Sequence, residues 1–141
     1  MLPYFNTSGP CIPGEHYMLP PERRLEHVLE LIEARRYFTL HAGRQTGKTT
    51  SAMWLADHLE ATGRWHALWI DLETARETPD VTDAMSAILK VFEDALAARH
   101  PQRPRPEPAE RLAMLATPKT ALLDYLKRLA ALAERPLVLL L

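Results

Sequence analysis

The sequence has a single cysteine, Cys11, among its 141 residues, so no disulfide can form within the chain. This scarcity suits a reducing compartment such as the cytosol. An excess of charge of one sign is also missing, because the formal net charge is -1 at pH 7. A chain so close to neutral gives no electrostatic argument for binding nucleic acid or an anionic membrane surface.

Long apolar runs and a secretory leader are absent as well. No apolar stretch approaches the roughly 20 residues that would span a bilayer. The first residues lack a basic segment followed by an apolar core, and Pro3, Pro10, Pro13 and Gly14 interrupt them instead. The histidines show no metal-ligand spacing with cysteine or with one another. We therefore expect a cytoplasmic globular protein with no membrane partner.

The pattern of turn-forming and apolar residues predicts an irregular arm over residues 1–20 and a domain over residues 21–141. Predicted helices begin near residues 21, 48, 79 and 118, the first ending near residue 36. Predicted strands cover residues 37–42, 65–73 and 135–141. The prolines of residues 100–108 predict a loop there. Strands that alternate with helices indicate an α/β fold with a parallel sheet flanked by helices.

Two helix ends have recognisable capping residues. Thr78 and Pro79 are expected to be the N-cap and first residue of the third helix. Gly63 is well placed to cap the C-terminal end of the helix that begins at Lys48.

Residues 42–50 read A-G-R-Q-T-G-K-T-T, directly after an apolar segment. The phosphate-binding loop is usually written G-x-x-x-x-G-K-[ST], and this chain matches it with Ala42 in place of the first glycine. The alternative is a solvent-exposed turn that happens to contain a lysine. The flanking pattern, with a strand predicted before the loop and an amphipathic helix after it, favours the phosphate site.

The chemistry of phosphate binding explains which letters matter. Gly47 has no side chain to keep the backbone N–H groups away from phosphate oxygens, and the following helix directs its positive end to the same place. Lys48 supplies a mobile cation, and the Thr49 hydroxyl can ligate Mg²⁺. The other candidate binding residues of the loop are Ala42, Gly43, Arg44, Gln45, Thr46 and Thr50.

The loop, the aromatic segment before it and the N-terminal S-G-P-C-I-P-G-E-H-Y-M-L-P-P-E-R-R-L-E-H-V-L-E-L-I together resemble bacterial AAA-like, STAND-type P-loop ATP-binding proteins. The resemblance covers most of residues 4–74. It implies ATP with Mg²⁺ as the ligand and an arm that helps to enclose the adenine. The arm candidates are Gly9, Pro10, His16 and Tyr17. The alternative is an arm that packs on the edge of the sheet.

In that family an apolar strand ends in two acids, which hold Mg²⁺ through water and polarise the attacking water. The L-V-L-L-L of residues 137–141 resembles this strand, and the sequence ends at Leu141 before any acid. We expect the given sequence to be part of a longer chain and hydrolysis to require the residues that follow. Alternatively, Asp71 is itself the acid associated with the metal, as in simpler kinase-like P-loop proteins. Otherwise Asp71 caps a turn at the end of its strand.

Three functions remain open at this point. The first is the ATP-binding module of an AAA-like ATPase. The second is a switch that uses ATP to order itself for a protein partner or a second copy of the chain. The third is a small phosphotransferase in which Asp71 serves the metal and residues 100–108 form part of a lid.

Overall fold

The computed structural model describes residues 2–43 and 46–141. The protein is a mixed α/β structure that is mostly helical, with a two-stranded parallel sheet packed against helices. It divides into two compact units, Met1–His58 and Leu59–Leu141. In the part of the chain that the structure describes, no helix is both long and apolar enough to span a membrane.

The first unit contains the arm, helix α1 (Pro21–Glu33) and most of helix α2 (Lys48–Ala61). Helix α1 has proline at its first position, where the missing N–H has no helical partner to lose. Its apolar spacing places Leu25, Val28 and Ile32 on one buried stripe. The predicted helix is therefore confirmed, except at its end.

Helix α1 ends three residues earlier than predicted, because the chain closes it with a left-handed residue. Arg35 has a φ of 53°. Its N–H donates to the Ile32 carbonyl at 2.9 Å, and the Arg36 N–H donates to the Leu31 carbonyl at 2.8 Å. This pair of hydrogen bonds is the Schellman motif, which satisfies the last carbonyls of the helix. Glycine usually occupies the left-handed position, so arginine there could not be expected from the local pattern.

Helix α2 begins at Lys48 as predicted and buries Leu55, Ala56 and Leu59. Gly63 follows it with a φ of 70° and donates its N–H to the Glu60 carbonyl at 3.0 Å. The predicted glycine cap is thus confirmed.

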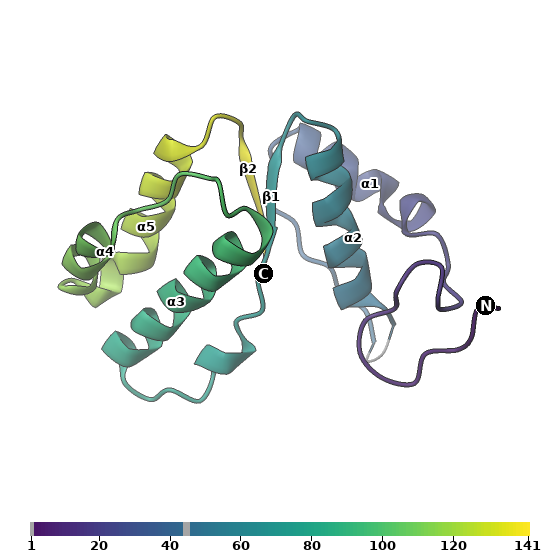
Figure 1. Ribbon diagram of the computed structural model, residues 1–141, viewed down its shortest axis with the longest axis horizontal. Helices are drawn as coiled ribbons and strands as arrows, with labels where there is room; N and C mark the ends of the chain where they lie inside the picture. The colour runs from purple at the N-terminus through teal and green to yellow at the C-terminus, as the bar shows by residue number, and fades with distance from the viewer. Residues whose placement is uncertain (1, 44–45) are drawn as a thin grey trace. The chain divides into compact units, whose positions relative to one another are not determined.

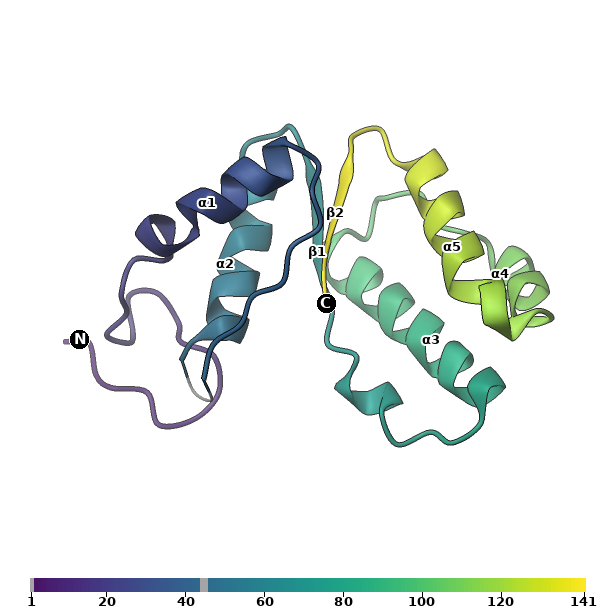
Figure 2. The same cartoon turned by 180° about the vertical axis from the view of Figure 1, so that it is seen from behind.

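The strand predicted over residues 37–42 is not formed. Residues 36–43 have no regular secondary structure, and Tyr37 is fully exposed. Figure 2 shows this segment as an irregular trace that runs from the end of α1 toward the start of α2. Aromatic and β-branched composition favours a strand only where a neighbouring strand pairs with its N–H and C=O groups. None of the described strands pairs with this segment.

The second unit holds the sheet, formed by β1 (His66–Trp69) and β2 (Leu137–Leu140). The strands are parallel, with His66 opposite Leu137 and Trp69 opposite Leu140. The chain between them forms the 3₁₀ turn η1 (Glu73–Ala75) and the helices α3 (Val81–Arg99), α4 (Pro108–Leu115) and α5 (Pro118–Leu132). In Figure 1 these three helices lie on one side of the strand pair. The strands predicted around these positions are confirmed.

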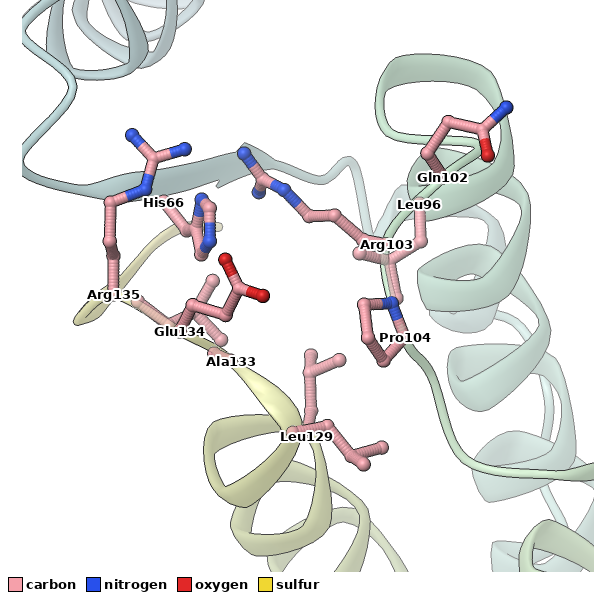
Figure 3. A pocket seen from close by; sticks show the side chains of 11 residues that line it. His66, Leu96, Gln102, Arg103, Pro104, Leu129, Ala133, Glu134 and Arg135 are labelled. Atoms are coloured by element: carbon pink, nitrogen blue, oxygen red, sulfur yellow. The ribbon is translucent and has the colours of Figure 1, made fainter.

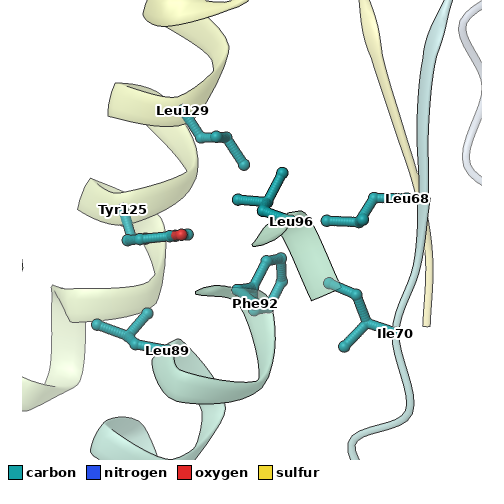
Figure 4. Packing of buried hydrophobic residues seen from close by; sticks show 7 residues of the cluster. All are labelled: Leu68, Ile70, Leu89, Phe92, Leu96, Tyr125 and Leu129. Carbon is teal, nitrogen blue, oxygen red and sulfur yellow. The ribbon is translucent and has the colours of Figure 1, made fainter. Parts of the chain in front are cut away.

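The core of the second unit joins the sheet to α3 and α5. Figure 4 shows side chains from β1, α3 and α5 pointing toward one another. The buried cluster consists of Leu68, Ile70, Leu89, Phe92, Leu96, Tyr125 and Leu129. Along α3, Leu89 and Leu96 are buried in this cluster, whereas Val81 at the start of the helix is half exposed.

Two helix starts differ from the prediction. Asp80, not Thr78, caps α3, because its carboxylate accepts hydrogen bonds from the Thr82 and Asp83 N–H groups at 2.8 and 3.1 Å. Helix α4 was not predicted at all. It begins with proline, and the Glu110 carboxylate accepts from the Glu107 N–H at 2.9 Å. The spacing of these two glutamates around a proline was the available signal.

Polar side chains link the three helices of this unit. The buried Tyr125 hydroxyl donates to Glu93 at 2.7 Å, and Arg111 lies 3.2 Å from the other oxygen of the same carboxylate. Burial raises the pKa of Tyr125 well above its usual range, and the hydrogen bond to the Glu93 carboxylate raises it further. Arg128 of α5 pairs with Glu110 of α4 at 2.9 Å. Tyr125 is thus a core residue with a satisfied hydroxyl.

Candidate phosphate-binding loop

The chain turns sharply at Gly47, immediately before the first residue of α2. Gly47 has a φ of 80°, a left-handed conformation that glycine adopts without steric cost. The Ser51 N–H donates to the Gly47 carbonyl at 2.9 Å, as the helix ladder begins. The first N–H groups of a helix have no partner within it, so they and the positive end of the helix dipole are directed at this loop.

Two side chains hold the loop in a closed shape. The Thr46 hydroxyl donates to the Gly43 carbonyl at 2.8 Å. Lys48 Nζ donates to the carbonyls of Ala42 and Gly43, both at 2.8 Å. A lysine ammonium has three N–H donors, so one donor has no partner among the described residues. All four residues are exposed, and the cation therefore lies over the start of the loop within reach of solvent.

The two threonines that follow Lys48 have different surroundings. Thr49 is exposed, whereas Thr50 is half-buried and its hydroxyl accepts a hydrogen bond from the Cys11 N–H at 3.1 Å. Thr50 therefore ties the arm to the first turn of α2, and Thr49 has the more accessible hydroxyl. Arg44 and Gln45, which were also predicted to line the loop, lie outside the described residues.

Arg24 of α1 also reaches the loop, which the sequence did not reveal. Its Nη2 donates to the Thr46 carbonyl at 3.3 Å, and its Nη1 lies 4.0 Å from where a Gly47 Cβ would stand. The only sequence signal was one basic pair in an amphipathic helix, a pattern that more often marks a solvated face. Among the described residues, Arg24 and Lys48 thus place positive charge beside the loop.

The arm is ordered by its own contacts. The His16 side chain is nearly buried, and its Nδ1 accepts the Ile12 N–H at 2.8 Å. Its ring also packs edge-on against Tyr4, with centroids 4.7 Å apart. His16 therefore holds the turn of the arm, and this use of its ring argues against a contact with adenine.

The other arm candidates remain accessible. Tyr17 is 54% exposed, and its ring lies 4.9 Å from that of Phe5. Gly9 and Pro10 are exposed. Their role in enclosing a base stays a prediction.

Asp71 lies in the second unit, two residues after β1. Its Oδ1 accepts the Glu73 N–H at 2.9 Å, so it caps the turn that leads into η1. This is the structural role considered from the sequence. A role in Mg²⁺ binding stays a prediction, since the loop belongs to the other unit. Among the described residues, no three His, Cys, Asp or Glu side chains gather as a metal site.

A second polar cluster, which the sequence did not predict, surrounds Glu60 in the second unit. Arg103 Nη2 donates to both Glu60 oxygens at 2.7 and 2.6 Å, and the Ala67 N–H donates to Oε1 at 2.6 Å. His100 Nε2 lies 3.5 Å and His66 Nδ1 3.8 Å from the same oxygen. The cluster anchors the proline-rich loop to the end of α2 and the start of β1.

Burial and charge shift the pKa values in this cluster. Burial alone would raise the pKa of Glu60, but the hydrogen bonds from Arg103 and from the Ala67 N–H outweigh it and lower the value. Burial lowers the pKa of His66, and the charges of Arg103 and Arg135 lower it further against the opposing effect of Glu60. Burial also lowers the pKa of His100, although its hydrogen bond to Ala67 acts in the other direction.

The lowered pKa values of these three side chains predict that acid destabilises the second unit. His66 and His100 bind protons more weakly in the folded than in the unfolded chain, so stability falls as pH drops below about 6.5. The lowered pKa of Glu60 stabilises the folded state above its unfolded value and adds a further loss below about pH 4.5. Urea unfolding at pH 7.5, 6.5 and 5.5 checks this. Equal free energies of unfolding at the three pH values would contradict this prediction. In His66→Gln, the free energy of unfolding should depend less on pH, because one titrating group is removed.

Comparison of this chain with protein families, with curated proteins and with solved structures finds no match.

Proposed function

We propose that residues 42–50 bind the phosphates of ATP together with Mg²⁺, in a P-loop domain whose parallel sheet is flanked by helices. The observation that carries this proposal is the junction of Gly47 and Lys48. A left-handed glycine stands directly before a helix, and the first side chain of that helix turns back over the loop. Backbone donors, a helix dipole and a lysine cation then meet at one exposed place, as phosphate binding requires.

Several described residues of the loop have a role in this proposal. Lys48 exchanges one or both carbonyl partners for β- and γ-phosphate oxygens, or uses its remaining N–H for them. Thr49 offers its hydroxyl to Mg²⁺, whose remaining ligands would be phosphate oxygens and water. Gly43 and Thr46 shape the loop through their mutual hydrogen bond. The small side chain of Ala42 leaves its carbonyl accessible to Lys48.

The resemblance to AAA-like, STAND-type proteins supports ATP as the nucleotide, and it extends from the arm through the loop. The contact between Cys11 and Thr50 adds support, since it brings the arm to the first turn after the loop. Hydrolysis would further require a carboxylate that polarises water. We therefore assign ATP binding to the loop, and this assignment does not depend on hydrolysis.

A titration of the purified chain with a fluorescent ATP analogue, with and without Mg²⁺, tests the proposal. We expect saturable binding that Mg²⁺ strengthens. Thr49→Val keeps the branched shape and removes the hydroxyl, so it should reduce the effect of Mg²⁺ more than binding without the metal. A folded chain that does not bind the analogue would rule out the site.

The same preparation distinguishes the alternatives once binding is measured. Steady release of phosphate to water would favour an ATPase, and transfer to an added acceptor would favour the phosphotransferase. Tight binding without either would favour a nucleotide-dependent switch that acts on a partner protein or a second copy.

A further inference from the structure

The second unit contains a pocket that the proposed nucleotide site does not use. It has a volume of about 210 Å³ and lies between the end of α3, the proline-rich loop, the end of α5 and the start of β2. Pockets for drug-sized ligands measure roughly 300–1,000 Å³, so this one suits a smaller molecule. Figure 3 shows the side chains that line it.

One wall of the pocket has an unsatisfied polar atom. His66 is only 6% exposed, and its Nδ1 lies 3.8 Å from Glu60 Oε1 with no hydrogen-bond partner among the described residues. An anion at this atom would meet the Glu60 carboxylate, so His66 forms a wall of the pocket and Arg135 supplies the charge that attracts an anion.

Two arginines place positive charge around the same imidazole. Figure 3 shows the Arg103 guanidinium extending toward His66, with Arg135 on the other side of the ring. Arg103 is paired with Glu60, whereas Arg135 has no ion pair or hydrogen bond with any described residue. The Arg135 guanidinium passes beside Gly63, with Nη1 4.0 Å from where a Cβ would stand. Its charge is therefore available to an anion.

The floor of the pocket is apolar. Leu96 of α3, Leu129 of α5 and Leu137 of β2 line it together with Pro104. Leu96 and Leu129 are almost fully buried within the core, so they form a fixed surface. An inorganic anion would leave this floor in contact with water, whereas an aliphatic chain would cover it.

We propose that this pocket binds a small aliphatic carboxylate. Its carboxylate lies at Arg135, beside the His66 ring, and its hydrocarbon chain lies on the leucine floor. The Glu134 carboxylate also faces the pocket and is the one acidic group that lines it. Glu134 repels an anion and Arg135 attracts it, so removing each charge should change binding in opposite directions.

The test measures binding of acetate, butyrate, hexanoate and inorganic phosphate to the full chain by ¹H–¹⁵N NMR, following the His66 ring nitrogens. We expect affinity to rise about fourfold for each added methylene until the floor is covered. Phosphate should bind no better than acetate. A stronger response to phosphate than to hexanoate, equal binding of acetate and hexanoate, or no binding by the folded chain would overturn the proposal.

Two variants that replace a charged side chain with a neutral polar one test the charges in opposite directions. Arg135→Gln should weaken hexanoate binding roughly tenfold, because it removes a charge-assisted hydrogen bond. Glu134→Gln should strengthen binding by a few-fold, because it removes a like charge. Lys127→Gln, on the exposed face of α5, is the matched control and should change nothing.

Unfolding curves accompany the variants, so that a loss of binding is not mistaken for a loss of fold. Binding that does not respond to Arg135→Gln, or that weakens in Glu134→Gln, would contradict the proposal. Because the nucleotide loop lies in the other unit, failure of either proposal leaves the other intact.

Discussion

Lys48→Ala is expected to weaken binding of Mg²⁺-ATP roughly ten- to a hundredfold, which corresponds to about 1.5–3 kcal/mol. The reason is that the variant removes a charge-assisted contact to the phosphates, which is stronger than a neutral hydrogen bond. The same titration with a fluorescent ATP analogue measures the change.

The structure indicates that this variant should fold normally. Lys48 is exposed, and its two partners are carbonyls of exposed residues, which water can satisfy after the substitution. Substitutions at such sites usually change stability by less than about 0.5 kcal/mol. Lys127→Ala is the matched control, because it removes an exposed lysine far along the chain from the loop. Equal affinity in the wild type and in Lys48→Ala would mean that the motif does not bind phosphate.

Phe92→Ala is expected to lower the free energy of unfolding of the second unit by about 3–5 kcal/mol. Phe92 is completely buried at the centre of the core cluster, and its ring meets the Tyr125 ring at a centroid distance of 5.7 Å. The substitution removes buried apolar surface and leaves a cavity that α3 and α5 cannot close without moving. Urea unfolding followed by circular dichroism measures the loss.

Two further substitutions make this result specific to packing. Phe92→Leu keeps most of the apolar volume and should cost much less than the alanine variant. Ser86→Ala changes an exposed position of the same helix and should stay within about 0.5 kcal/mol of the wild type. If Phe92→Ala were as mild as Ser86→Ala, the core described around α3 would be incorrect.

Local signals predicted most helices well, because each depends on neighbours in the sequence. Proline at the first helical position predicted the starts of α1 and α5, and Gly63 predicted the end of α2. The end of α1 was missed because arginine occupies the left-handed position there. The start of α3 was missed because Thr78 and Asp80 are both plausible caps, and the local sequence does not say which one the chain uses.

The segment at residues 37–42 shows why a strand cannot be predicted from local composition alone. Its composition favours an extended chain, but a strand exists only with a hydrogen-bonded partner, and composition does not supply one. By contrast, the segments around β1 and β2 were found, and each has the other as its partner.

In the candidate site, too, the features set by consecutive residues were predicted and those set by the tertiary fold were missed. The spacing of Gly47, Lys48 and Thr49 identified the loop, because all its parts are consecutive residues. The contributions of Arg24 and of the contact between Cys11 and Thr50 depend on the tertiary fold, and neither has a local pattern. The cluster around Glu60 was missed for the same reason, since its members lie on three separate segments.

The parallel pairing of β1 and β2 also constrains the order in which the second unit can fold. The paired residues are about 70 positions apart in sequence, so their contacts require closure of a long loop, whereas helix contacts within α3, α4 and α5 are local. We therefore expect the strands to join after the helices have formed. Leu140→Ala should then accelerate unfolding and leave the folding rate nearly unchanged in stopped-flow measurements. Slower folding with an unchanged unfolding rate would place the strand pair in the nucleus instead.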